Sequence, residues 1–192
     1  MRLVLATRNP HKVSELADLM PDHELVALPD DVELPPEDGE TFAENALGKA
    51  RAAAAALGMP AIADDSGVEA AALDGRPGVR SARYAGPDAT DHENLMKLMQ
   101  EAPVGSALAY VCAMAYVDPA AGVEEGVAGR CTGTLDPHPR GGNGFGYDPA
   151  FLPDDAPGDP GRTMAELLPE EKAAISHRGR AVRALLEVLP RP

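Results

Sequence analysis

The chain alternates short apolar runs with longer segments in which apolar residues recur at helical spacing. The apolar run Arg2–Ala6 predicts a strand, and the apolar spacing across 13–20 predicts a helix behind it. Asn9 is a good N-cap and Pro10 suits the first helical position. The loop between strand and helix should therefore present backbone N–H groups at a helix N-terminus, where anions bind.

Two further helices are predicted to begin with a capping box. Thr41 lies three positions before Glu44 and opens an Ala-rich helix that stops at Gly58. Thr90 and Glu93 repeat the same pattern before another helix. These signals predict where both helices begin, independently of their packing.

The remaining apolar runs predict strands and a last helix. The strands are expected at Glu24–Leu28, Ala61–Ala63, Ser106–Val117 and Val123–Leu135, and the helix runs from Ser176 to Leu189. Asp118 to Gly122 joins the last two strands as the turn of an antiparallel hairpin. Helices between short strands, with a hairpin in the middle, predict an α/β fold with a mixed sheet.

The composition is that of a globular protein. The chain has 192 residues, of which 44% are hydrophobic and 25% charged, so it can bury a core as one domain spanning 1–192 or as two small lobes. Cys112 and Cys131 form no CxxC pair, which favours reduced thiols in the cytoplasm. A leader pattern and a stretch of 18 apolar residues are both missing, so we expect neither export nor a membrane span.

The charge is strongly negative but unevenly spread. With 17 Lys and Arg against 31 Asp and Glu, the formal net charge is −14, which argues against binding nucleic acids or anionic membranes. Residues 1–12 and 172–183 hold seven of the cations and no acid, which leaves 10 cations against 31 acids elsewhere, a net of −21. This pattern favours a small polyanionic ligand held locally. Lys12 is the best phosphate candidate, whereas Arg180 and Arg183 are better explained as solvated surface residues.

An acidic pair supplies the first candidate chemistry. Familiar nucleotide motifs are excluded, because Gly48 and Lys49 lack the rest of a P-loop and the glycines near 144 lack dinucleotide-binding spacing. Asp64 and Asp65 follow a buried strand, and Gly67 is expected to turn the chain behind them. Adjacent strand residues face opposite sides, so the two acids should have different tasks, such as binding a hard cation and accepting a proton. An ordinary surface turn is the alternative.

A Gly-rich aromatic loop supplies the second candidate chemistry. Asn143–Phe151 holds three aromatics in a chain with only 3 Phe and 4 Tyr, and such a loop can stack on a planar base. A hook that closes a hairpin explains Tyr147 and Phe151 equally well. Ser176–Gly179 offers several donors at a helix start, although His177 could be an ordinary cap or surface residue.

Five segments in order resemble one family. ATRNPHK, ETFAENALGKA, IADDSG with SARYAG, GFGYDPAF and EEKAAISHRGRA are similar to the inosine triphosphate pyrophosphatase family, and to its bacterial XTP/dITP diphosphatases in particular. The resemblance covers nearly the whole chain. It implies a mixed twisted sheet with flanking helices, and two lobes with the active-site cleft between them. It also implies a homodimer that uses Mg²⁺ to hydrolyse ITP, dITP or XTP to the monophosphate and pyrophosphate.

The resemblance also implies a role for each matching residue. Asp65 would activate the attacking water and bind the metal together with Glu37, while Asp64 would orient the site. The remaining matches would bind substrate: Thr7, Arg8, Asn9, Pro10, His11, Lys12 and Ser66 at the phosphates, Phe145, Gly146, Tyr147 and Asp148 at the base and sugar, and Lys172, His177 and Arg178 at the base edge. Arg8 and His11 stand where many members have Gly. Donors at the base edge would accept a 6-oxo group and reject adenine.

Two other functions fit parts of the pattern. A pyrophosphatase of the related Maf-like group would favour pyrimidine or modified nucleotides. A nucleotide-sensing module would bind without cleaving, although the presence of Glu37, Asp64 and Asp65 together speaks against it.

Overall fold

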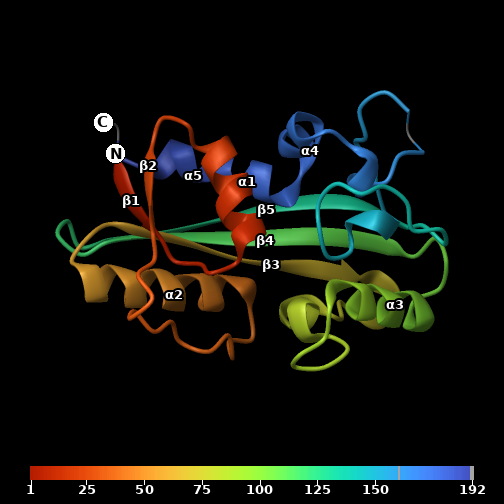
Figure 1. Ribbon diagram of the computed structural model, residues 1–192, viewed down its shortest axis with the longest axis horizontal. Helices are drawn as coiled ribbons and strands as arrows, with labels where there is room; N and C mark the ends of the chain where they lie inside the picture. Colours follow the sequence, from red (N-terminus) through yellow and green to blue (C-terminus); the bar gives the residue numbers. More distant parts are fainter. Residues whose placement is uncertain (160, 191–192) are drawn as a thin grey trace. The chain divides into compact units, whose positions relative to one another are not determined.

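The computed structural model describes residues 1–159 and 161–190. Six strands form one mixed sheet in the order β2-β1-β3-β4-β5-β6 (Figure 1). The strands are β1 (Arg2–Leu5), β2 (Glu24–Ala27), β3 (Ala61–Ala70), β4 (Ala107–Asp118), β5 (Val123–Leu135) and β6 (Phe151–Pro153). β1 pairs in parallel with β2 and β3, whereas β5 and β6 are antiparallel, which confirms the predicted α/β class.

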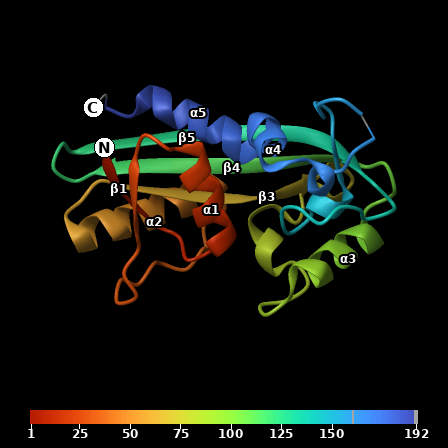
Figure 2. The same cartoon turned by 45° about the horizontal axis from the view of Figure 1, so that its top comes forward.

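Five α-helices flank the strands (Figure 2). They are α1 (Pro10–Leu19), α2 (Phe42–Leu57), α3 (Asp91–Glu101), α4 (Pro169–Ile175) and α5 (His177–Val188). Short 3₁₀ turns lie at Ala71–Leu73, Gly78–Arg83, Asp148–Ala150 and Met164–Glu166.

The capping signals are confirmed. Asn9 accepts hydrogen bonds from two backbone N–H groups at the start of α1. Both capping boxes are formed, at Thr41 for α2 and at Thr90 for α3. Gly58 ends α2 in the left-handed conformation with φ 61°, where glycine meets no steric penalty. Local hydrogen bonds are therefore present at each of these predicted ends.

The sequence prediction for the acidic strand was wrong in extent. β3 does not stop at Ala63 but continues to Ala70, so Asp64 and Asp65 lie inside the strand. Gly67 does not turn the chain either. It is a buried strand residue at which a Cβ would lie 2.3 Å from the Ser81 hydroxyl, so only glycine admits this contact.

Two elements were not predicted. Helix α4 occupies a segment that the sequence pattern left without an element, and β6 follows the Gly-rich loop as a three-residue edge strand. Both are short, and short elements carry weak periodicity signals.

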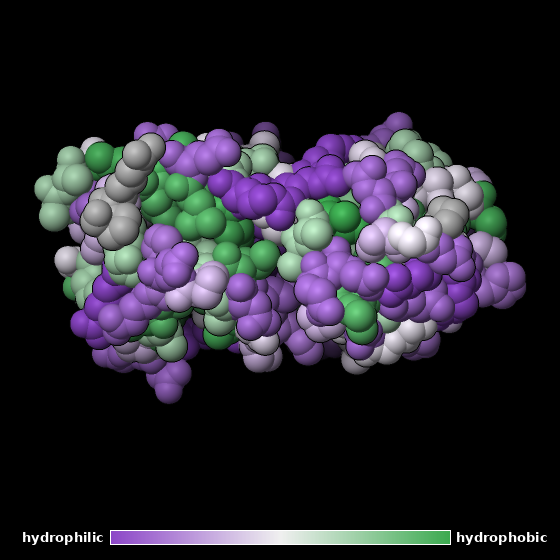
Figure 3. Space-filling view, turned by 90° about the horizontal axis from the view of Figure 1, so that it is seen from above, coloured by the Kyte–Doolittle hydropathy of each residue, from purple (hydrophilic) through white to green (hydrophobic). Residues whose placement is uncertain are grey.

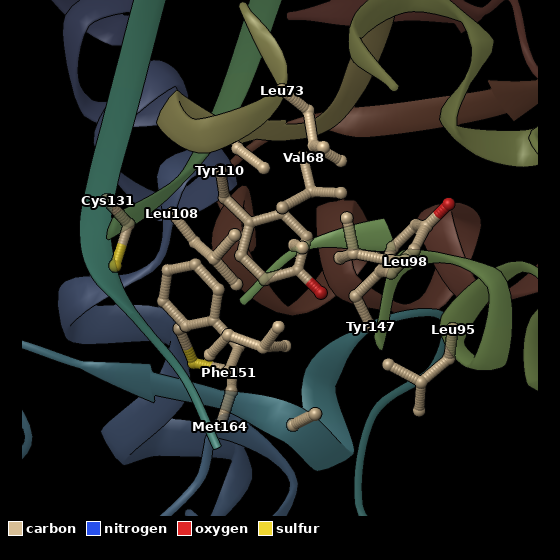
Figure 4. Close-up of a cluster of buried hydrophobic side chains, with 14 of the residues drawn as sticks. Val68, Leu73, Leu95, Leu98, Leu108, Tyr110, Cys131, Tyr147, Phe151 and Met164 are labelled. Carbon is tan, nitrogen blue, oxygen red and sulfur yellow. The ribbon is translucent and has the colours of Figure 1, made fainter. Parts of the chain in front are cut away.

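The chain divides into two compact units. Unit 1 comprises residues 1–65, 112–129 and 180–192, and unit 2 comprises 66–111 and 130–179. The core of unit 1 packs β1, β3 and β4 against α1 and α5, around residues such as Leu16, Ile62 and Leu185. The core of unit 2 is a second cluster, in which Tyr110 lies beside Phe151 (Figure 4).

The face drawn in the space-filling view carries many hydrophilic residues together with a broad hydrophobic area (Figure 3). Cys112 and Cys131 are buried and form no disulfide. Among residues 1–159 and 161–190, none of the helices combines the length and apolar character needed to cross a membrane.

Candidate functional site

Asp64 and Asp65 face different partners within unit 1. Asp64 is fully buried and forms an ion pair with Lys12 of α1, at 3.1 Å between Oδ2 and Nζ. Asp65 instead contacts Asn45 of α2, whose amide donates to its Oδ2 at 2.8 Å. Helices α1 and α2 lie on opposite faces of the sheet (Figure 1), as the alternation of strand side chains requires. The two acids thus face opposite sides of the sheet, as predicted, while their separate tasks stay a prediction.

The orientation of Asn45 is fixed by a second hydrogen bond. Its Oδ1 accepts from the backbone N–H of Gly39 at 2.8 Å, which leaves the amide nitrogen to face Asp65. A Cβ on Gly39 would lie 2.6 Å from that oxygen. The loop before α2 therefore needs glycine here for the amide to reach its position.

The pKa of Asp65 is raised above the ordinary value of an aspartic acid. Burial is the largest cause, and the neighbouring Glu37 carboxylate adds to it by repulsion. The hydrogen bond from Asn45 and the charges of Lys49 and Lys12 act in the opposite direction. Asp65 is therefore a carboxylate whose proton affinity is increased, as suits a general base.

Lys49 connects the two acidic segments. Its ammonium donates to Oε1 of Glu37 and, at 2.7 Å, to the backbone carbonyl of Asp64. The Lys49 side chain is only 6% exposed, so this cation is held within the site. It anchors the acidic loop that carries Glu37 to β3.

The carboxylates of Glu37 and Asp65 suit a hard cation that is also held by the phosphates of a substrate. In the described parts of the chain, 1–159 and 161–190, no cluster of three or more His, Cys, Asp or Glu side chains could hold a metal alone. Mg²⁺, however, is usually bound by one or two carboxylates together with substrate phosphates. Glu37 and Asp65 are two such carboxylates, close enough to repel one another. Their chemistry therefore fits Mg²⁺.

The loop before α1 is only partly directed at this centre. Lys12 reaches Asp64, but the Arg8 guanidinium turns away and donates to the carbonyl of Val32 at 2.7 Å. Asn9 caps α1 by accepting from the N–H groups of His11 and Lys12. Thr7 accepts from the N–H of Asn9. Pro10 begins the helix, and both it and His11 are exposed.

Asp148 organises the aromatic loop in unit 2. Its Oδ2 accepts from Lys172 Nζ at 2.8 Å and from the backbone N–H of Phe145 at 2.9 Å. Its Oδ1 accepts from the Tyr110 hydroxyl at 3.0 Å. The carboxylate is 2% exposed, so its negative charge is compensated by these donors. Asp148 thus holds the loop and Lys172 in place.

Phe145 lies beside two cations. Lys172 Nζ is 5.1 Å from the ring centroid and the Arg178 guanidinium carbon is 5.9 Å from it. Arg178 is 1% exposed and donates to the Ser66 hydroxyl at 2.9 Å. His177 stacks on Tyr110, with ring centroids 4.6 Å apart. Lys172 and Arg178 therefore lie beside Phe145, and Arg178 also contacts Ser66, whereas His177 contacts Tyr110.

Tyr147 is placed differently from its neighbour Phe145. Its ring belongs to the core of unit 2 (Figure 4), and its hydroxyl donates to the carbonyl of Ser81 at 2.8 Å. Burial raises the pKa of this phenol. Phe151 is likewise fully buried. Gly146 offers only its backbone, which donates to Asp91 at 2.8 Å.

Three residues of these clusters were not predicted from the sequence to belong to a site. Asn45 lies on one face of an Ala-rich helix, Tyr110 lies in an apolar strand, and Lys49 was considered only as part of a rejected P-loop. A signal existed for the helix residues, because Asn45 and Lys49 are four positions apart and so share a helix face. Tyr110 gave no local signal.

The family model described as the Ham1 family matches residues 3–188. The chain belongs to the Ham1 family. Two relatives named dITP/XTP pyrophosphatase agree with this assignment. The protein of Cutibacterium acnes is 48% identical, covering 96% of this chain and 94% of its own length. The protein of Frankia alni is 50% identical, covering 98% of this chain and 97% of its own length.

A solved Ham1 structure has the same fold. The Ham1 protein of Coxiella burnetii superposes with a TM-score of 0.87 at 39% sequence identity, over 98% of both chains. The mixed sheet with flanking helices is therefore a Ham1 fold, and the family resemblance seen in the sequence is confirmed.

Proposed function

We propose that this Ham1 protein hydrolyses deaminated purine nucleoside triphosphates, namely ITP, dITP and XTP, to the nucleoside monophosphate and pyrophosphate. The observation that carries the proposal is the buried Asp65 carboxylate, held by Asn45 beside Glu37. Relatives that are 46–50% identical over nearly their whole length are named dITP/XTP pyrophosphatases. Removal of these nucleotides would protect the nucleotide pool.

Unit 1 would carry the chemistry. Asp65 would accept the proton of the water that attacks the α-phosphorus, with its raised proton affinity favouring this step. Glu37 and Asp65 would hold Mg²⁺, which when bound neutralises the triphosphate and orients the water. Lys12 would contribute positive charge at the phosphates, and Asp64 would fix its position through their ion pair.

The backbone and side chains of the N-terminal loop would complete the phosphate subsite. Its members are Thr7, Arg8, Asn9, Pro10 and His11. Arg8, whose guanidinium donates to the Val32 carbonyl, would mainly shape this loop.

Unit 2 would recognise the base. Phe145 would stack on the purine, while Lys172, His177 and Arg178 would present donors to its 6-oxo edge. Ser66 would contact the substrate next to Arg178. An adenine amino group would meet donors instead of acceptors and would be rejected. The loop backbone at Gly146, Tyr147 and Asp148 would border the sugar.

The proposal extends to the state of the protein. We expect one functional domain spanning 1–192, a homodimer in solution, and a cytoplasmic location. The net charge of −14 argues against a nucleic acid or membrane partner, and the acid-free basic segments 1–12 and 172–183 support a small triphosphate as the ligand.

The test is a nucleotide panel assayed for pyrophosphate with Mg²⁺. We expect release from ITP, dITP and XTP, and little from ATP and GTP. Faster release from dTTP would favour a Maf-like enzyme instead. Binding of ITP without any release would indicate a nucleotide-sensing module.

The variant Asp65→Asn tests the proposed base. It keeps the size of the side chain and an acceptor for Asn45, but it removes the group that takes up the proton. We expect kcat to fall by about 10²–10⁴-fold. Asp31→Asn, at an exposed position of the same unit, is the control and should retain the parent rate. An Asp65→Asn protein with the parent kcat would refute the assignment.

A further inference from the structure

Tyr110 contacts two of the residues proposed to recognise the base. Its ring is nearly parallel to the His177 imidazole, with an interplanar angle of 10° and a centroid distance of 4.6 Å. Its hydroxyl donates to Asp148 Oδ1 at 3.0 Å. All three side chains are at least 94% buried and belong to unit 2.

The position of the Tyr110 ring is itself fixed by the core. Phe151, which is fully buried, packs against it with a centroid distance of 4.5 Å and an interplanar angle of 34° (Figure 4). A ring packed in this way cannot change rotamer without disturbing its neighbours. The core therefore holds the Tyr110 ring in one position, and the contacts of Tyr110 in turn hold His177 and Asp148.

Asp148 extends this influence to the aromatic loop. One of its oxygens accepts from Tyr110, and the other accepts from both Lys172 and the Phe145 backbone. A buried carboxylate that loses one of its donors must find another or move, because an unsatisfied charge is costly. Loss of the Tyr110 hydroxyl should thus shift the carboxylate that sets the directions of Lys172 and the Phe145 loop.

We propose that Tyr110 is a positioning residue that determines base selectivity, by holding His177 and Asp148 in one fixed arrangement. This inference rests on the proposed function, since selectivity is defined by the nucleotides that the chain hydrolyses. Tyr110 itself need not touch the substrate. Its role in base recognition is distinct from the role of the unit 1 groups, which would act on the phosphates.

The test compares Tyr110→Phe with the parent protein on ITP, XTP, GTP and ATP. Tyr110→Phe keeps the ring that stacks on His177 and removes only the hydroxyl. We expect KM for ITP to rise about 10-fold, with kcat changed less than about threefold, because a single hydrogen bond to a charged group is lost. The ratio of kcat/KM for ITP over ATP should fall by a similar factor, because the donors that reject the adenine amino group are no longer held in place.

Tyr116→Phe is the matched control. Tyr116 is a fully buried tyrosine of the same strand, and its hydroxyl donates to the carboxylate of Asp118 at 3.3 Å. Neither residue belongs to the proposed site. The Tyr116→Phe variant should have the KM and the selectivity of the parent. The same change in Tyr110→Phe and in Tyr116→Phe would indicate a general loss of packing and would overturn the inference.

A double-mutant cycle tests whether Tyr110 acts through Asp148. In an Asp148→Asn background, the further change Tyr110→Phe should alter KM less than it does in the parent. Full additivity of the two effects would contradict the proposed route. Tyr110→Leu, which also loses the stack on His177, should reduce selectivity further, and Tyr110→Phe decides alone if this variant does not fold.

The two levels of the proposal fail in different ways. A parent protein that releases no pyrophosphate from any 6-oxo purine nucleotide would refute the proposed function. A parent that hydrolyses ITP, alongside a folded Tyr110→Phe with unchanged KM and unchanged selectivity, would refute the role of Tyr110 alone.

Discussion

At the scale of single residues, Asp65 combines two opposed influences. Burial and the nearby Glu37 raise its pKa, while the amide of Asn45 stabilises the charged form. The backbone of Gly39 fixes that amide. Asp65 is therefore a buried carboxylate with increased proton affinity, held in one orientation by the Asn45 amide.

This arrangement predicts a pH-dependent gain of stability in Asp65→Asn. Because the folded-state pKa of Asp65 is raised, the folded protein holds this proton more tightly than the unfolded chain does. The charged group therefore destabilises the fold increasingly as pH rises from the ordinary pKa of an aspartic acid through the folded value. We expect Asp65→Asn to unfold at a higher temperature than the parent at pH 8, with the difference shrinking at pH 4.

The measurement is thermal unfolding in a metal chelator without nucleotide. In a chain of this size, each 1 kcal/mol shifts Tm by about 2–4 °C. Asp31→Asn, at an exposed position, should show no such pH dependence. A gain that was larger at pH 4 than at pH 8 would contradict the raised pKa.

At the scale of elements, β3 carries the acids because helices supply their partners. Lys12 from α1 and Asn45 from α2 compensate Asp64 and Asp65 within the strand. The strand can then continue past two buried carboxylates, which it could not do in an apolar core. Beyond them, Gly67 allows the turn at Gly78–Arg83 to approach the strand closely.

Gly67→Ala should therefore destabilise the protein. The added Cβ would lie 2.3 Å from Ser81 Oγ and 2.7 Å from the carbonyl oxygen of Gly78. Relief requires the backbone to move, and such overpacking costs about 1–3 kcal/mol. Denaturant unfolding of both proteins measures this difference.

Gly126→Ala provides the comparison within another strand. Gly126 is an exposed residue of β5, and a Cβ there would meet no atom within 4 Å. This variant should be neutral or slightly stabilised, because alanine reduces the entropy of the unfolded chain. Equal losses in the two variants would show that close approach at Gly67 is not the cause.

At the scale of the whole molecule, each of the two compact units holds largely buried cations, of which Lys12, Lys172 and Arg178 come from the basic segments of the sequence and Lys49 does not. The chain carries −14 overall, yet Lys12, Lys49, Lys172 and Arg178 are all largely buried beside candidate site residues. Cations in such positions can meet a small polyanion that enters a site. They cannot form the extended contacts that a duplex requires.

We accordingly expect no binding of duplex DNA at about 150 mM salt. Fluorescence anisotropy of a labelled duplex should stay unchanged on adding the protein, and excess duplex should not slow pyrophosphate release from ITP. Unlabelled ITP analogues that resist hydrolysis are the positive control and should inhibit. Inhibition by the duplex would show that an extended basic surface exists.

The sequence by itself determined the features that depend on near neighbours. Asn9, Thr41 and Thr90 satisfy backbone groups two or three positions away. The neighbouring strands β4 and β5 are joined by a short turn, between Asp118 and Val123. That Asp64 and Asp65 contact different partners also followed from local alternation. The family itself was evident from the order of five motifs.

Only the tertiary structure decided which distant residues complete these local patterns. Arg178 bonds Ser66 across 112 positions of sequence, and Tyr110 bonds Asp148 across 38. It also decided that Tyr147 faces the core while Phe145 lies beside Lys172. The physical reason is that burial and partnership of a polar side chain depend on how elements pack, which no local pattern of residues encodes.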